Sequence, residues 1–474
     1  MAKLTDLPVE LVMRIIHYVL YPNHTCQKHG PTSLGDHHLL DHNQINCLAK
    51  PKPRPHEERK IVSCEERDCR VYCEQLSWPK GLPKNPLVPL SLVNRAFRQC
   101  AQEHLFKNVD LQKTSTTRLF LKSLTCTSKS SNQRQNRDNR PSQLSRHVRS
   151  LQFSWGVCRV TGKSGASLFR KVLQTCPLLE NILITSQFLH EFKDVILEAL
   201  ASKPFIKEIV ILWRKDRDSS IYDWQAHEVF SRLFSNWNLL ETVELSGIGS
   251  WASNSANPPL HTFPTLNCAI RTMILKDHHF DELTLSNLLK SCGASMRKLQ
   301  ITGPGLSLNP DAFGRVLRDS TNPNLECLIV LSTYHREYMF RNLNYDVPVI
   351  SPGVLDIAFD SPTALKNLKT LSFHGGYMAT NRLFARLPKS LVKLSVEQWK
   401  IPASALIKAL VSSGHNEGPL SNLMCCSVRR SGEWDIKDEM VVQQIMEMRG
   451  GCFHIICDRA LDSSLPTHSN RSHS

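Results

Sequence analysis

The stretch LENILI at residues 179–184 decides the fold, because its pattern returns along most of the chain. In this pattern an apolar residue is followed three and five positions later by two more. Each copy predicts a short strand with one buried face, since residues two apart on a strand point the same way. The ten copies are VRSLQF (148–153), LENILI (179–184), IKEIVI (206–211), LETVEL (240–245), IRTMIL (270–275), MRKLQI (296–301), LECLIV (325–330), LKTLSF (368–373), LVKLSV (391–396) and LSNLMC (420–425).

Helical segments such as FKDVILEAL and TLSNLLKSC, with apolar residues at helical spacing, separate these strands. The strands begin 23 to 34 residues apart, except for one interval of 43. This alternation resembles irregular leucine-rich repeats, although the Asn that follows the consensus strand is absent. The resemblance implies an α/β strand–helix solenoid over residues 147–458, with a disordered tail at 459–474. A doubly wound sheet is the alternative, but the chain has no Gly-rich phosphate turn.

The middle residue of each predicted strand should point to the solenoid's concave side, opposite the buried positions. Large apolar side chains on such a side are candidate binding anchors. Packing against the linker or the 331–366 segment would leave the same composition, and both interpretations stay open. The candidate substrate-binding residues are Leu183, Val210 and Ile274, with Trp155 and Trp213 just beyond their strands.

The chain opens with a different element, DLPVELVMRIIHYVL at residues 6–20. Pro8 suits a first helical turn, and Asp6 and Glu10 place negative charge near the helix N-terminus. The pattern therefore predicts a helix over 8–20, with apolar residues four apart forming one wide face. A second apolar stretch, PLVPLSLVNRAFRQCAQEHLFKNVDL at 86–111, predicts two more short helices.

Together these stretches resemble an F-box. The likeness lies in the Leu-Pro-x-Glu-Leu start at 7–11, in LSLVNRAFR at 90–98, and in the ending HLFKNVDL at 104–111 that fungal members often show. Phe97 stands where many members have Trp, and residues 22–86 intervene where the family has only a few residues. Loop-closure entropy grows only logarithmically with length, so the helices can still form one small all-α module within residues 1–112.

The resemblance implies a substrate receptor of an SCF-type ubiquitin ligase. In that family the F-box binds a Skp-type adaptor, which is joined to cullin and RING subunits, while the solenoid holds a protein substrate. Such a receptor supplies proximity rather than chemistry. The alternatives are a non-ligase F-box scaffold and a basic nucleic-acid-binding repeat protein. Carried over by the resemblance, the adaptor contacts are Leu7, Pro8, Leu11, Val12, Ile15, Leu92, Val93 and Phe97.

The insertion at 22–86 is rich in His, Cys, Pro and charged residues, which predicts a largely disordered segment. Cys64, Cys69 and Cys73 could bind zinc with one more ligand, although paired Cys-x-x-Cys motifs are missing. Cys69 and Cys73 equally suit one helical turn of unliganded thiols. We expect no metal here and keep zinc as the alternative.

Composition bounds the remaining classes. The chain has 474 residues, 41% of them apolar, enough for a sizeable core, and its 16 cysteines show no disulfide spacing. We find no secretory signal and no apolar run of about 18 residues, so we expect a protein of the cytoplasm or nucleus. The net charge of +15 is spread out, with one concentration at 129–149 inside a predicted helix and basic linker over 113–146.

No motif predicts catalysis or a cofactor. GVCRVTGKS at 156–164 has five residues between its first Gly and Gly-Lys-Ser, where a phosphate-binding loop has four. The chain also lacks His-Glu-x-x-His and Gly-x-Ser-x-Gly motifs. We therefore expect a chain that is not an enzyme.

Overall fold

The structure is a computed structural model that describes most of the repeat region and part of the N-terminal region. The described residues divide into one compact unit up to Thr272 and another from Met273, and we treat each by itself. They are residues 7–20, 87–125, 142–153, 162–185, 193–212, 224–249, 264, 266–304, 308–331, 352–375, 378–397, 401–412, 418, 420–429 and 434–456.

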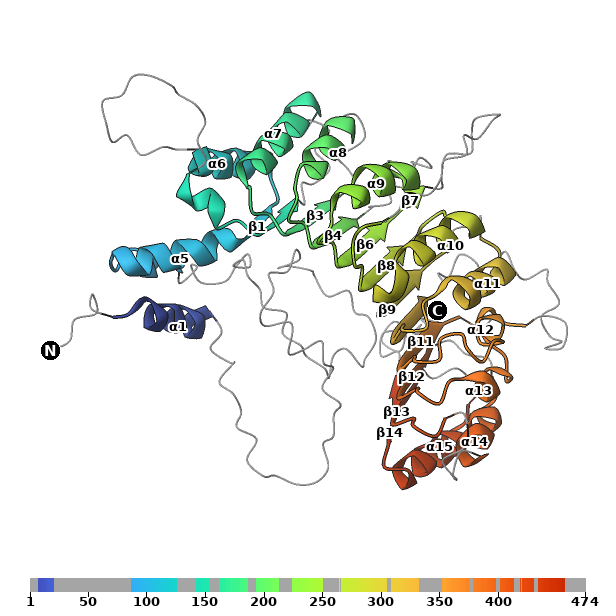
Figure 1. Ribbon diagram of the computed structural model, residues 1–474. Helices are drawn as coiled ribbons and strands as arrows, with labels where there is room; N and C mark the ends of the chain where they lie inside the picture. The colour runs from blue at the N-terminus through green and yellow to red at the C-terminus, as the bar shows by residue number, and fades with distance from the viewer. Residues whose placement is uncertain are drawn as a thin grey trace, which may run out of the picture. The chain divides into compact units, whose positions relative to one another are not determined.

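Twelve strands lie side by side in one sheet, in the order of the sequence (Figure 1). The first unit contributes β1 (Asn108–Leu111), β2 (Ser150–Phe153), β3 (Asn181–Thr185), β4 (Glu208–Leu212) and β6 (Thr242–Ser246), which pair in parallel. Strand β8 (Thr272–Lys276) follows. The second unit continues with β9 (Lys298–Thr302), β10 (Cys327–Leu331), β11 (Thr370–His374), β12 (Lys393–Glu397), β13 (Cys425–Arg429) and β14 (Cys452–Ile456), also parallel. The predicted α/β strand–helix solenoid is confirmed.

In each unit the helices cover one side of the strands (Figure 1). In the first unit they are α6 (Thr114–Thr125), α7 (Gly162–Thr175), α8 (Lys193–Ala201) and α9 (Ala226–Arg232), with short 3-10 turns at Gln143–Arg146 and Phe234–Asn236 and a small pair of strands, β5 (Trp224–Gln225) and β7 (Ile248–Gly249). In the second unit they are α10 (Glu282–Ser291), α11 (Pro310–Ser320), α12 (Val354–Ala358), α13 (Leu383–Arg386), α14 (Ala403–Ser412) and α15 (Ile436–Met448), with a 3-10 turn at Gly293–Ser295. Within the described ranges, no helix combines the length and apolar character that a membrane span requires.

The core of each unit lies between its strands and its helices. On β9, Leu299 and Ile301 are fully buried toward the helices, whereas Gln300 between them is half-buried on the helix-free side. Helix α11 meets such strands with Phe313 and Leu317, one turn apart and both buried. The period of two on the strand and of nearly four on the helix is therefore the pattern read from the sequence.

A backbone carbonyl just before most of the strands sets the register with the next strand. The carbonyl of Glu180 accepts hydrogen bonds from the amides of Lys207 at 2.7 Å and Glu208 at 3.2 Å. The same double acceptance recurs at Arg149, Lys207, Glu241, Arg297, Glu326, Lys369 and Val392. These eight pairs of neighbouring strands thus share the same backbone geometry, whatever the length of the connection between them.

The sheet extends one strand beyond the predicted repeats at each end. Strand β1 was expected only as the F-box ending, but it pairs with β2, so the sheet begins at Asn108 rather than at residue 147. Strand β14 was not predicted, because glycines, Gly450 and Gly451, stand where the pattern should begin with an apolar residue.

The tenth predicted copy, at 420–425, is misplaced by three residues. Strand β13 begins at Cys425, and the buried positions of its pattern are Leu423, Cys426 and Val428. The error arose because Leu420 is fully buried as well and mimics the start of the pattern.

A buried carboxylate ties α12 to the segment before α13. Asp356 is fully buried, and its Oδ2 accepts hydrogen bonds from the amides of Gly353 and Thr380, both at 2.8 Å. Gly353 has no room for a side chain, since a Cβ there would lie 2.6 Å from the Cα of Ala379. One side chain therefore satisfies two amides at a close backbone crossing.

Replacing Asp356 by Ala is expected to lower the free energy of unfolding by about 2–4 kcal/mol, because a buried and a half-buried amide lose their acceptor. Urea denaturation of the full chain, followed by circular dichroism, measures this change. The matched control is Asp360→Ala. It removes an ion pair between Arg386 and the half-exposed carboxylate of Asp360, and it should change the free energy of unfolding by less than about 1 kcal/mol. Equal losses in the two variants would contradict the structural role of Asp356.

Candidate functional site

Three helices form a small module that we call the head: α1 (Val9–Leu20), α4 (Leu87–Leu90) and α5 (Arg95–Lys107). Both α1 and α4 pack against α5, although residues 21–86 lie between α1 and α4 in the sequence. The two apolar stretches therefore do meet as one three-helix module. Its buried core consists of Val12, Ile16, Leu87, Phe97, Cys100 and Ala101, with Leu7, Met13, Leu90 and Leu105 partly buried around it.

Local hydrogen bonds start the helices of the head. The carbonyl of Pro8 accepts from the amides of Leu11 at 3.0 Å and Val12 at 3.1 Å, which opens α1. Asn94 caps α5, because its side-chain oxygen accepts from the amide of Phe97 at 2.9 Å. Such a cap satisfies an amide that the helix itself leaves without an acceptor. It also begins the helical turn that directs Phe97 into the core.

The head exposes a second set of apolar side chains. On α1 these residues lie on a stripe different from that of Val12 and Ile16. The most exposed member is Leu92, at 73%, in the turn between α4 and α5. Isolated exposed apolar residues are common, but a small module that exposes so many is typical of a docking surface. The exposed apolar residues of the head are Val9, Leu11, Ile15, Val19, Val88, Leu92 and Val93.

The eight predicted adaptor contacts fall into two groups. Six have accessible side chains: Leu7, Pro8, Leu11, Ile15, Leu92 and Val93. The other two, Val12 and Phe97, are 0% and 2% exposed, so assigning them to a partner is a misassignment. Val12 faces α5 rather than solvent, and the Asn94 cap turns Phe97 inward. Both side chains hold the head together.

Two of the predicted substrate contacts do lie side by side. Leu183 on β3 pairs in register with Val210 on β4, as the repeat pattern requires. Each is only 2% exposed, however, so the expected exposed patch is corrected. The longer side chains of Gln152 and Glu244 flank them in the same row, and side chains on paired strands are close enough to shield one another.

The remaining predictions divide between described and undescribed parts of the chain. Ile274 lies on β8 and is half-buried. Trp155 and Trp213 lie outside the described residues, as do Cys64, Cys69 and Cys73 of the alternative zinc site.

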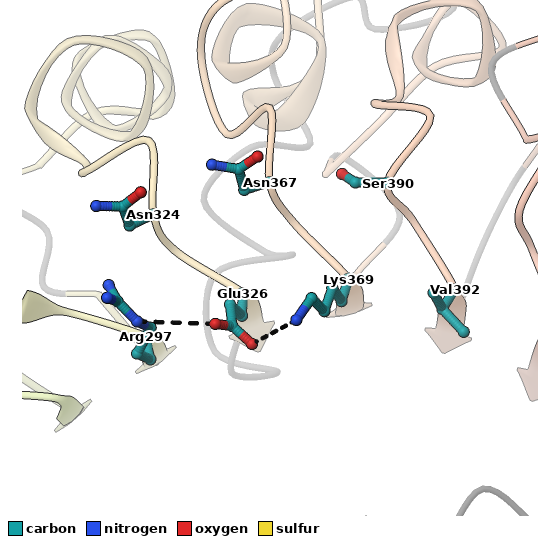
Figure 2. A pocket seen from close by; sticks show the side chains of 7 residues that line it. All are labelled: Arg297, Asn324, Glu326, Asn367, Lys369, Ser390 and Val392. Atoms are coloured by element: carbon teal, nitrogen blue, oxygen red, sulfur yellow. Dashed lines mark hydrogen bonds and ion pairs between the residues drawn. The ribbon is translucent and has the colours of Figure 1, made fainter.

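A shallow pocket of about 380 Å³ lies in the second unit, at the edge where its strands begin (Figure 2). Glu326 is its centre, with Arg297 at 3.7 Å on one side and Lys369 at 3.0 Å on the other. The other lining residues are Asn324, Asn367, Ser390 and Val392. This set includes neither His nor Cys, and it offers hydrogen-bonding groups rather than a nucleophile with a base.

The same alternation of charge occurs in the first unit. The Glu180 carboxylate forms ion pairs with Arg149 at 3.2 Å and with Lys207 at 2.9 Å. These residues occupy the position whose carbonyl sets the strand register. The charges therefore follow the repeat, and the pocket is a local case of a repeated surface feature.

The buried thiols of the first unit are poor nucleophiles. Burial raises the pKa of the Cys176 thiol to about 12 and that of Cys268 to about 11. In the head, burial and then the nearby Glu103 carboxylate raise the pKa of Cys100. Because the thiolate is the nucleophile, these three cysteines suit packing rather than catalysis.

Sequence analysis missed one cluster of possible metal ligands, formed by Cys425, Cys452 and His454. Two of these residues lie on β14, the strand that was not predicted. The available signal was the 27-residue separation of the two cysteines, which equals one repeat and places them on equivalent positions of adjacent strands.

Comparison with known proteins gives distant structural likenesses, two of which are described here. No family model matches the sequence, and no curated protein matches it. One similar solved structure is the leucine-rich repeat-containing protein LegL7 from Legionella pneumophila, at 14% identity over 78% of this chain and 97% of that chain, with a TM-score of 0.37. Another is a chain of the Rad7 and Elc1 complex in yeast, at 13% identity over 74% of this chain and 84% of that chain, with a TM-score of 0.35.

Replacing Phe97 by Ala is expected to destabilise the head by about 3–5 kcal/mol, because the change leaves a cavity among fully buried neighbours. Amide hydrogen exchange of α1 and α5 in the full chain measures this local stability. The control is Leu92→Ala, which removes a mostly exposed side chain and should shift the exchange free energy by less than about 0.5 kcal/mol. If both variants exchange like the wild type, the head does not depend on the described core.

Proposed function

We propose that the chain is the substrate-recognition subunit of an SCF-type ubiquitin ligase. In this proposal the head binds a Skp-type adaptor, and the sheet of repeats binds a protein substrate. The observation that carries it is the division of the head into a buried core and a second, exposed apolar set. That exposed set contains Leu11, Ile15, Leu92 and Val93, four of the residues that the F-box resemblance assigns to the adaptor.

The exposed apolar set offers several anchors to a partner. Burying one Leu, Ile or Val side chain is worth about 1.5–3 kcal/mol in transfer free energy. Several such anchors can offset the loss of translational and rotational freedom on association. The buried Val12, Ile16 and Phe97 stabilise the helices that present these anchors. The partner would therefore meet a surface that is already formed.

The substrate would bind the side of the strands that the helices leave open. In the second unit this side carries Ile274, Gln300, Ile329 and Ser372, all half-buried. Gln300, Ile329 and Ser372 follow one another in register across β9, β10 and β11. A row that combines an aliphatic side chain with amide and hydroxyl groups suits a peptide segment, because it offers both apolar contact and hydrogen bonds.

The chain itself would contribute no chemistry. Its role would be to raise the effective concentration of a substrate lysine near a charged ubiquitin carrier that the cullin and RING subunits bring. This role needs neither a catalytic residue nor a cofactor in the chain. We further propose that the protein acts in the cytoplasm or nucleus, where such ligases act.

Replacing both Leu11 and Ile15 by Glu is expected to weaken adaptor binding by about 100-fold or more, because central interface anchors contribute about 2 kcal/mol or more each. Affinity purification of the tagged full chain, with quantitative mass spectrometry, should show adaptor and cullin lost together. The matched control is Leu283→Glu, a change at an exposed apolar residue of α10, which should leave both partners bound.

The same experiment separates the alternatives. Cullin retained by a double variant with an unchanged thermal melt would contradict the proposal. Adaptor captured by the wild type without any cullin would instead identify a non-ligase scaffold. Enrichment of nucleic acid that falls steeply with salt would favour the nucleic-acid-binding alternative.

A further inference from the structure

The last two strands of the sheet bring together three possible metal ligands, two sulfur donors and one nitrogen donor. Cys425 on β13 and Cys452 on β14 are paired in register, and His454 lies two residues beyond Cys452. The two sulfur atoms and a ring nitrogen of His454 all lie within 4.8 Å of one another. The residues next to Cys425 and Ser427 along β13, Cys426 and Val428, are buried in the core. By alternation, the cluster therefore occupies the helix-free side of the sheet.

We propose that Cys425, Cys452 and His454 bind one Zn²⁺ ion, with water as the fourth ligand. Two thiolates and an imidazole are the donors that zinc prefers, whereas magnesium and calcium prefer oxygen. In a tetrahedral site with Zn–S bonds of about 2.3 Å, the sulfur atoms lie about 3.8 Å apart. Since the ligand atoms already lie within 4.8 Å of one another, bringing the sulfur atoms to this separation needs a shift of at most about 1 Å.

A buried hydroxyl supports the site independently. Ser427 lies on the same side of β13 as Cys425 and is paired in register with His454. Its side chain is fully buried, and its Oγ has no hydrogen-bond partner. A buried polar atom without a partner is unfavourable and calls for an explanation. A zinc-bound water, or the second ring nitrogen of the coordinating His454, would supply that partner.

The backbone at the start of β14 holds Cys452 beside Cys425 before any metal binds. The amide of Cys452 donates to the carbonyl of Met424 at 2.7 Å. The chain reaches this point through a tight turn in which Gly450 has a φ of 72°. At Gly451 a Cβ would lie 2.7 Å from the same Met424 carbonyl. Only glycines therefore allow so close an approach, and the two sulfur ligands are already aligned.

The metal would fasten the final repeat to the rest of the second unit. Strand β14 ends the twelve-stranded order, so among the described strands its outer edge has no neighbour. Terminal repeats of repeat proteins are stabilised by a neighbouring repeat on one side only. A zinc bridge between β13 and β14 would close the segment that contains α15 into a loop. This role does not depend on the proposed ligase function.

The test uses the purified full chain, kept reduced and stripped of metal, and titrated with Co²⁺ as a spectroscopic substitute for Zn²⁺. One equivalent should give the visible bands of tetrahedral cobalt and a thiolate-to-cobalt charge-transfer band. Zn²⁺ should displace the cobalt and raise the melting temperature. Cys452→Ser and His454→Ala should each weaken Co²⁺ binding by about 100-fold or more, since each removes one ligand.

Matched variants keep the result specific. Changing Cys64, Cys69 and Cys73 together to Ser should leave the cobalt spectrum unchanged, and so should Cys327→Ser on β10. The proposal is overturned if the wild type gives no thiolate band, or if Cys452→Ser and His454→Ala bind like the wild type. It is also overturned if the chain isolated from cells carries a Cys425–Cys452 disulfide that, after reduction, forms again in preference to metal binding.

Discussion

The architecture depends on one backbone constraint, the carbonyl before most of the strands that accepts two amides from the start of the next strand. The carbonyl of Glu326, for example, receives the amides of Lys369 and Thr370, although 43 residues separate the two strand starts instead of the more usual interval near 30. The connection between strands can therefore lengthen or shorten, as long as the chain returns to this point. The side chains there remain at the surface and carry the alternating charges of Arg297, Glu326 and Lys369.

The head follows a different principle, because its stability and its surface come from separate stripes of the same helices. Val12 and Ile16 face α5, while Leu11 and Ile15 face outward. A partner that covers the outward stripe would add to a module that is already folded, rather than complete an unfinished one. This separation lets the proposed docking surface change in sequence without a loss of the head. It also explains why a resemblance based on motif positions mixes core residues with contact residues.

The strands in the middle of the sheet could be predicted from the sequence, because each buries two apolar residues at a spacing that only a strand explains. The ends could not. Strand β14 starts after two glycines, and the extra buried Leu420 shifted the pattern at β13. The repeat pattern places Leu183 and Val210 side by side, as the strand pairing shows, but their burial depends on neighbours in the row, which periodicity does not describe. The cluster of Cys425, Cys452 and His454 needed the register of two strands, which sequence spacing suggests but does not establish.

The junction between the head and the sheet has a mechanical consequence. Helix α5 ends at Lys107 and β1 begins at Asn108, so no linker separates them, and the Lys107 carbonyl accepts from the amide of Arg149 ahead of β2. Rotation of α5 against the first strands would have to break this hydrogen bond and the β1–β2 pairing. The junction is therefore a rigid connection rather than a hinge. A partner bound to the head would therefore keep a fixed orientation to the first repeats, and a force applied to the head would act directly on the first strands.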